Sequence, residues 1–199
     1  MDADCRACYT AFEGTRRIAS GDLTDVVRVT KMVIDQGGLA PVSIFDDATG
    51  EPVEVDYRGP VEEVVRRVAA PSSTEVPAAG SHGLASARGP GRPRLGVVAR
   101  EVTLLPRHWE WLNSQPGGAS VALRKLVEDA RRANQGKDRL RRARDAAYQF
   151  MVAMAGNEPG FEEAIRALFA GDSGRFVACV EPWPADVRDH ARTLAAQAF

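Results

Sequence analysis

The segment over residues 71–94 most constrains how this 199-residue chain can fold, because it carries almost no large apolar side chain. It is rich in proline, alanine, glycine and serine, a composition that buries too little apolar surface to offset the entropy lost on folding. We therefore expect a flexible linker there. The chain would then fold in separate parts: a domain over residues 1–70, a central module over 95–135 and a helical region over 136–199.

The first part has the pattern of a small α+β domain. Four short β-prone runs are separated by turns, and an amphipathic stretch lies between the second and the third. The sequence predicts strands at residues 8–13, 16–19, 42–45 and 53–57, a helix from residue 22, and a short helix over 60–70. The order ββαββ corresponds to a sheet with one helix packed on it. Three aspartates in its loops, Asp46, Asp47 and Asp56, lack EF-hand spacing, so we expect them to form turns rather than a metal site.

The central module combines a strand, a proline-initiated helix and a basic helix. Residues 100–105 are β-prone, and Pro106 suits the first turn of a helix because its missing N–H needs no partner there. Residues 116–118 end this helix, and Ser120 is placed to cap the next one. The second helix has an apolar stripe opposite its basic side chains, made of Leu123, Leu126, Val127 and Ala130.

This order of elements resembles the ribbon-helix-helix family, in which the strands of two chains pair into a ribbon. The resemblance is carried by residues 102–106, Trp109, Leu112 and residues 117–127. It implies an obligate homodimer whose paired strands enter the major groove of DNA. It also implies that the N-terminal amides of the second helix bind a phosphate.

Charge is distributed unevenly along the chain. Residues 88–145 carry 14 Lys and Arg against 6 Asp and Glu, whereas the residues before them carry 8 against 14 and those after them 4 against 7. Clustered positive charge is typical of proteins that contact a polyanion such as DNA. The predicted DNA-contacting residues are Arg92, Arg94, Arg100, Thr103, Gly118, Ser120, Arg124, Lys125, Arg131 and Arg132.

The predicted strand has two registers, and both stay open. Side chains alternate along a strand, so Val102 and Leu104 share one face and Glu101 and Thr103 share the other. If Val102 and Leu104 are core, Glu101 faces DNA and is repelled by phosphates unless it accepts from a cytosine amino group. If the faces are swapped, Arg100 reaches the groove but Glu101 is buried without a partner.

Upstream of the strand, residues 91–93 are similar to the centre of an AT-hook, a peptide that lays arginine into a narrow minor groove. A flexible basic linker is the alternative. Downstream, Gly136 is expected to end the basic helix. The sequence then predicts helices over residues 138–155, 161–170, 173–180 and from 184 to the C-terminus.

Chemical motifs are sparse, so we expect no enzymatic activity, no cofactor and no metal. Cys5 and Cys8 have C-x-x-C spacing, but a zinc site needs two further ligands. Asp186 and His190 lie four residues apart on a predicted helix, where an exposed ion pair is expected rather than a metal site. No serine or cysteine nucleophile stands beside His108 in the sequence.

The chain resembles, over nearly its full length, the bacterial proteins grouped as Domain of Unknown Function 2239. The matching stretches are residues 9–12, 45–50, 91–96, 101–120 and 155–161. This resemblance implies no known activity, substrate or catalytic residue.

The sequence therefore predicts an α+β, homodimeric DNA-binding protein that acts as a transcriptional regulator, with acidic ends that supply contacts to a protein partner or effector. The alternative is a non-enzymatic interaction protein that uses the central module for dimerisation only. No apolar run approaches the ~20 residues of a membrane span. An acidic N-terminus and an odd number of cysteines indicate the cytoplasm.

Overall fold

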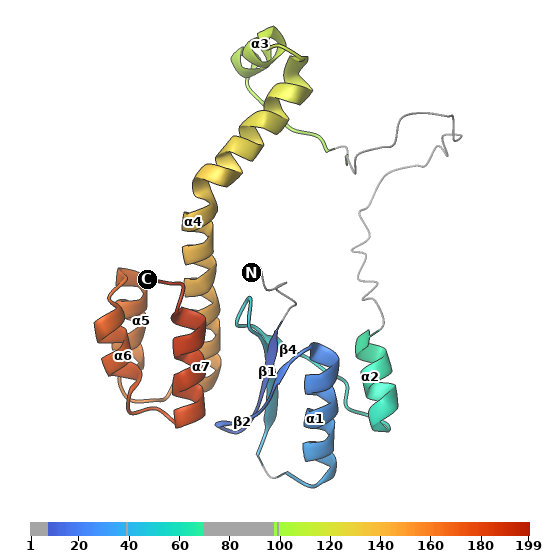
Figure 1. Ribbon diagram of the computed structural model, residues 1–199, viewed down its shortest axis with the longest axis vertical. Coiled ribbons are helices and arrows are strands. Elements are labelled where there is room, and N and C mark those ends of the chain that lie inside the picture. The colour runs from blue at the N-terminus through green and yellow to red at the C-terminus, as the bar shows by residue number, and fades with distance from the viewer. Residues whose placement is uncertain (1–7, 39, 70–97, 99) are drawn as a thin grey trace, which may run out of the picture. The chain divides into compact units, whose positions relative to one another are not determined.

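The computed structural model describes residues 8–38, 40–69, 98 and 100–199 (Figure 1). The chain forms two compact units, which we call the terminal unit, residues 1–72 with 134–199, and the central unit, residues 73–133. The predicted linker, with Arg92, Arg94 and the AT-hook-like residues 91–93, lies outside the described residues.

The terminal unit contains a four-stranded antiparallel sheet of order β2-β1-β3-β4. Its strands are β1 Tyr9–Glu13, β2 Arg16–Gly21, β3 Val42–Asp46 and β4 Pro52–Val53. The first three predicted strands are confirmed, whereas β4 shares only Val53 with its predicted range, residues 53–57. The chain leaves the sheet after Val53 and turns at Asp56, whose Oδ1 accepts a hydrogen bond from the Arg58 backbone N–H at 3.1 Å. Such a turn competes with strand pairing.

One face of the sheet is covered by α1 Leu23–Asp35 and α2 Val61–Ala69, both of which were predicted. The Asp22 side chain caps α1 by accepting from the Thr24 backbone N–H. Five buried residues from the sheet and these helices form the core of this layer: Ala11, Val26, Val27, Ile44 and Val64.

The opposite face of the sheet is covered by helices from the C-terminal part of the chain. Phe12 of β1 and Phe45 of β3 point to this side, and their ring centroids lie 5.5 and 5.0 Å from that of Phe150. The prediction of a sheet with a single packed helix was therefore wrong. Strand alternation sends neighbouring apolar residues to opposite faces, so Phe12 and Phe45 needed a second covering layer.

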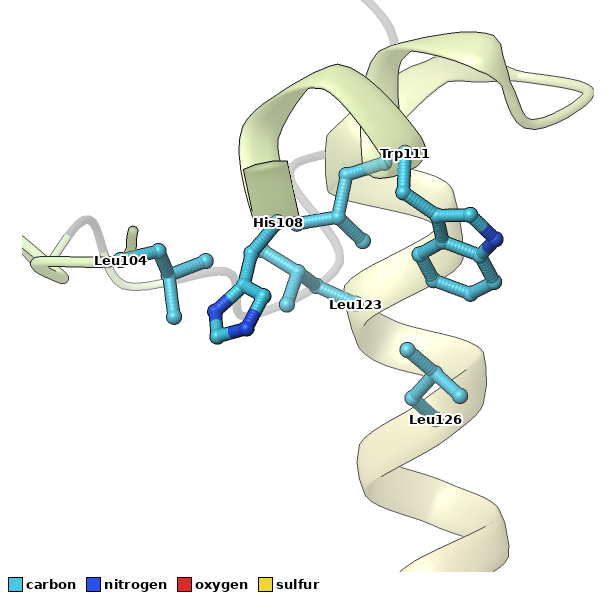
Figure 2. Close-up of a pocket in the computed structure, with 6 residues that line it drawn as sticks. Leu104, His108, Trp111, Leu123 and Leu126 are labelled. Atoms are coloured by element: carbon cyan, nitrogen blue, oxygen red, sulfur yellow. The ribbon is translucent and has the colours of Figure 1, made fainter. Parts of the chain in front are cut away.

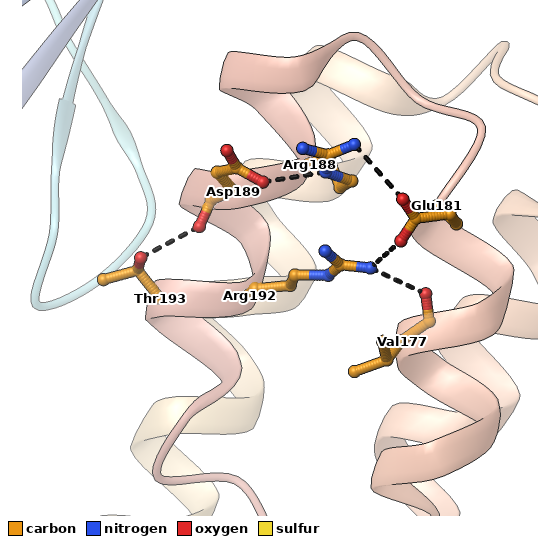
Figure 3. A network of polar contacts seen from close by, with 6 residues as sticks. All are labelled: Val177, Glu181, Arg188, Asp189, Arg192 and Thr193. Carbon is orange, nitrogen blue, oxygen red and sulfur yellow. Dashed lines mark hydrogen bonds and ion pairs between the residues drawn. The ribbon is translucent and has the colours of Figure 1, made fainter.

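That second layer consists of the end of α4 Gly118–Ala155 together with α5 Phe161–Ala170, α6 Ser173–Val180 and α7 Ala185–Ala195. The three short helices were predicted. Figure 3 shows how α6 and α7 are joined: Glu181 accepts from Arg188 and Arg192, and Arg192 also donates to the Val177 carbonyl at 3.0 Å. The hydrogen bond from Arg192 holds the pKa of Glu181 below its usual range.

Helix α4 differs from its prediction in two ways. It begins at Gly118, so Ser120 lies inside the first turn and is not the cap. It also continues through Gly136, which was expected to end it. A glycine inside a helix costs only about 1 kcal/mol relative to alanine, and the alanine, arginine and glutamine residues around Gly136 are better helix formers.

The central unit contains α3 Pro106–Ser114, which begins at the predicted proline, and the start of α4. Gly117 and Gly118 both have positive φ, 86° and 75°, and so allow the tight turn between the two helices. The predicted strand over residues 100–105 is not formed. A strand exists only within a ladder, and no described segment of this chain pairs with these residues.

Candidate nucleic-acid interface

The start of α4 presents a basic surface. At about 100° per residue, Arg124, Lys125, Arg131 and Arg132 fall within about 120° of the helix circumference, and all four are exposed. Glu128 lies inside this arc and pairs with Arg131 at 3.5 Å and with Arg132 at 3.3 Å. Such exposed pairs contribute little energy, so both guanidinium groups can exchange Glu128 for a phosphate.

Ser120 holds one of these basic side chains against the helix. Arg124 donates from Nε to the Ser120 carbonyl at 3.1 Å and from Nη2 to the Ser120 hydroxyl at 3.3 Å. The structure therefore brings two of the predicted site residues together. The Arg124 guanidinium therefore lies at Ser120, in the first turn of α4, the turn whose backbone amides the ribbon-helix-helix resemblance assigns to a phosphate.

An apolar groove of about 280 Å³ lies in the same unit. Leu104, His108, Trp111 and Leu112 line it from the segment before α3 and from α3 itself, and Leu123 and Leu126 line it from α4. In Figure 2 the imidazole of His108 lies between Leu104 and Leu123, and the indole of Trp111 lies on the same side as Leu126. Among these side chains only His108 offers a strongly polar group.

Large apolar side chains of the central unit are also unusually exposed. Val127 is 64% exposed, Val102 53%, Trp111 51% and Leu126 46%. Trp111 and Leu126 line the groove, and an apolar surface that a soluble protein leaves uncovered marks an interaction site. The basic surface and the groove therefore belong to a unit whose apolar side chains are not fully buried within one chain.

The segment over residues 100–105 keeps its two predicted site residues, Arg100 and Thr103, exposed. Leu104 is half-buried, and Glu101 is exposed. Sequence reasoning did not single out the groove, although a signal was available. His108 and Trp111 lie three apart in α3 and Leu123 and Leu126 three apart in α4, which places each pair on one side of its helix.

The terminal unit holds a chain of polar side chains that could suggest catalysis. The Thr10 hydroxyl donates to Asp47 Oδ2 at 3.0 Å and lies 3.1 Å from the Ser20 hydroxyl, while His190 Nε2 lies 3.3 Å from Asp47 Oδ1. A nucleophile needs its base as a direct neighbour. Here Asp47 stands between the hydroxyl groups and His190, so the imidazole cannot take a proton from Ser20 or Thr10.

The Cys8 thiol lies 3.8 Å from the Ser20 hydroxyl. Partial burial raises the pKa of this thiol, and the Asp47 carboxylate adds to the rise, whereas the Ser20 contact lowers it. Because the thiolate is the reactive form, this environment disfavours Cys8 as a nucleophile.

The position of His190 contradicts the exposed ion pair with Asp186 that the sequence predicted. This histidine is 3% exposed and lies beside Asp47, not in a surface pair with Asp186. Asp186 instead accepts from the Arg17 backbone N–H at 2.8 Å, on the edge strand β2. Helical spacing alone could not reveal this, since Asp47 is far away in the sequence.

Metal-binding and membrane-spanning features are absent from the part of the chain that the structure describes. No group of three or more His, Cys, Asp and Glu side chains in it is placed to hold a metal ion. Within the same residues, no helix combines the length and apolarity needed to cross a membrane.

These features define an α+β protein in which the start of a long helix carries a basic surface on one side and lines an apolar groove on the other. The chain belongs to the Domain of Unknown Function 2239 family, described as uncharacterised proteins conserved in bacteria, whose family model matches residues 8–195. Comparisons with curated proteins and with solved structures gave no match.

Proposed function

We propose that this protein is a homodimeric, cytoplasmic DNA-binding protein, a transcriptional regulator that contacts phosphates through the start of α4. The observation that carries the proposal is the exposed arc of Arg124, Lys125, Arg131 and Arg132 on one side of the helix. Lysine and arginine that neutralise phosphates release condensed counterions, which drives sequence-independent binding to DNA.

The uncovered groove supports the dimer in this proposal. Leu123 and Leu126 line it on the side of α4 away from the basic arc, so a second chain can cover the groove without hiding the basic side chains. Residues 100–105 have no strand partner among the described residues of one chain, and the same segment of a second chain offers one. Pairing these segments would bury Val102 or Leu105, which are both exposed here.

Binding of the full-length protein to a mixed-sequence DNA duplex, measured from about 50 to about 200 mM salt, tests the proposal. We expect affinity to fall steeply with salt. Replacing Arg124, Lys125, Arg131 and Arg132 by Gln should reduce the slope of log affinity against log salt by up to ~1 unit for each phosphate that is no longer neutralised.

A control variant with Gln at Arg28, Arg66, Arg166 and Arg175 loses the same formal charge from exposed positions of the terminal unit. It should keep most of the salt slope, since the basic arc of α4 is intact. Equal reduction of the slope in both variants would mean that net charge alone drives binding.

The groove also favours a second candidate, an interaction protein whose central unit only dimerises. Its apolar lining is suited to a protein surface and not to phosphates. If the wild-type protein is a dimer but has no measurable affinity for duplex DNA even at low salt, the DNA-binding function is excluded and this second candidate takes its place.

A further inference from the structure

Glu128 lies at the centre of the basic arc of α4. At about 100° per residue, one edge of the arc carries Arg124 and Arg131. The other edge carries Lys125 and Arg132, and Glu128 falls about midway between the two edges. Along the helix axis, two of the cations precede Glu128 and two follow it. Four cations therefore surround a single carboxylate.

The two ion pairs of Glu128 use the same carboxylate oxygen. Arg131 and Arg132 both contact Oε1, at 3.5 and 3.3 Å. An ionised carboxylate can accept about four hydrogen bonds on its two oxygens, so these contacts do not saturate it. The Glu128 side chain is 42% exposed, and a donor from another molecule can therefore reach it.

This arrangement fits the major groove of a DNA duplex. The groove is about 12 Å wide and admits an α-helix. A helix in the groove has a phosphate backbone along each of its edges and the edges of the bases in front of its centre. With the arc turned toward the DNA, the cations at its two edges meet phosphates, whereas Glu128 meets the bases.

We propose that Glu128 is the residue with which α4 discriminates between DNA sequences, and that it favours cytosine. This inference rests on the proposed DNA binding. When Arg131 and Arg132 turn to phosphates, the Glu128 carboxylate loses both of its partners and needs a new donor. At a site without such a donor, it is left close to phosphates of like charge, and binding is weaker.

Cytosine is the base that best supplies this donor. In the major groove it presents its N4 amino group, whereas guanine presents two acceptors, N7 and O6. Thymine presents an acceptor and a methyl group, and the amino group of adenine stands beside the N7 acceptor. Cytosine alone therefore offers a donor without an acceptor next to it on the same base.

Selection from a pool of duplexes with a randomised central segment, using the full-length protein, tests the proposal. We expect the wild type to enrich cytosine at one position of the bound duplexes. Two duplexes that differ only by thymine at that position then measure the preference. The wild type should bind the cytosine duplex about tenfold more tightly, as expected for one specific base contact.

Glu128→Gln should bind the two duplexes about equally, because an amide donates hydrogen bonds as well as accepting them. It should also bind mixed-sequence duplexes severalfold more tightly than the wild type, since a charge repelled by phosphates is removed. Asp129→Asn is the matched control. It removes the same charge from the next residue of α4, which lies about 100° from Glu128 and outside the arc, and it should keep the cytosine preference.

An unchanged cytosine preference in Glu128→Gln would overturn the proposal. A wild type that binds duplex DNA but enriches no base would overturn it as well. Both of these results leave phosphate binding by the arc intact. A wild type without measurable affinity for duplex DNA would instead exclude the proposed function, and the cytosine preference with it.

Discussion

The terminal unit buries its large apolar side chains, whereas the central unit leaves several of its own exposed. In the terminal unit the sheet is covered on both faces, and Phe12, Phe45 and Phe150 are at most 1% exposed. In the central unit Trp111 and Leu126 are about half exposed and line an open groove. The terminal unit completes its core within one chain, whereas the central unit leaves apolar side chains exposed, which we propose a second chain covers.

The two units also differ in what their charged side chains contact. The terminal unit uses its charged groups internally, as in the pairs between α6 and α7 and the hydrogen bond from Arg17 to Asp186. In the central unit, Arg131 and Arg132 of the basic arc share a single acid, Glu128. We therefore expect the central unit to interact with other molecules and the terminal unit to keep the fold stable.

The largest effect is expected at Gly50, where the loop between β3 and β4 meets α4. A Cβ atom there would lie 1.9 Å from the Ala146 carbonyl oxygen, and φ is +70°. Gly50→Ala should therefore separate the loop from the helix and destabilise the terminal unit by about 4 kcal/mol or more, as expected for a severe core defect. Thermal unfolding followed by circular dichroism measures the loss of stability.

Gly37→Ala is the matched control, because Gly37 also has positive φ, +82°, but nothing lies within 4 Å of the added atom. It should cost only the strain of the left-handed backbone, roughly 1–2 kcal/mol. Similar melting temperatures for the two variants would show that the close approach of the loop to α4 does not matter for stability.

The next effect compares the two units directly. Phe150→Ala should lower the free energy of unfolding by about 3–5 kcal/mol, because it empties a fully buried site. Trp111→Ala should leave unfolding of the terminal unit unchanged, with the buried Trp183 as the fluorescent probe. Instead it should weaken the dimer by about 30-fold, the size of an interface hot spot.

Sedimentation equilibrium across a range of protein concentrations checks the second half of this comparison. Trp109→Ala provides a control, since Trp109 belongs to the same helix but does not line the groove. If Trp111→Ala associates as tightly as the wild type, the groove is not the dimer interface. The exposed apolar side chains of the central unit would then have no role in dimerisation.

The smallest effect is expected at Glu101, which is exposed within one chain. Glu101→Gln should tighten non-specific DNA binding severalfold at low salt and leave stability nearly unchanged, because it removes a charge repelled by phosphates. If the change instead lowers stability without affecting DNA affinity, Glu101 is buried in the dimer and the strand has the opposite register.

Much of the local structure could be predicted from the sequence, because its signals are local. Alternation located β1 and β3, Asp22 marked the start of α1, and Pro106 marked the start of α3. The basic residues of the candidate site were likewise visible as charge clustered on one side of a helix. The prediction that a helix ends at Gly136 was wrong. A single glycine is a weak stop signal among good helix formers, and α4 continues through it.

What the sequence by itself determined, then, is the type and starting point of most elements and the charge each one carries, since periodicity, capping and proline act over a few residues. Only the tertiary structure decided that helices from the C-terminal part of the chain cover the second face of the sheet and that His190 faces Asp47. These contacts join residues far apart in the chain. Their partners are selected by complementary packing of whole layers, which no local pattern encodes.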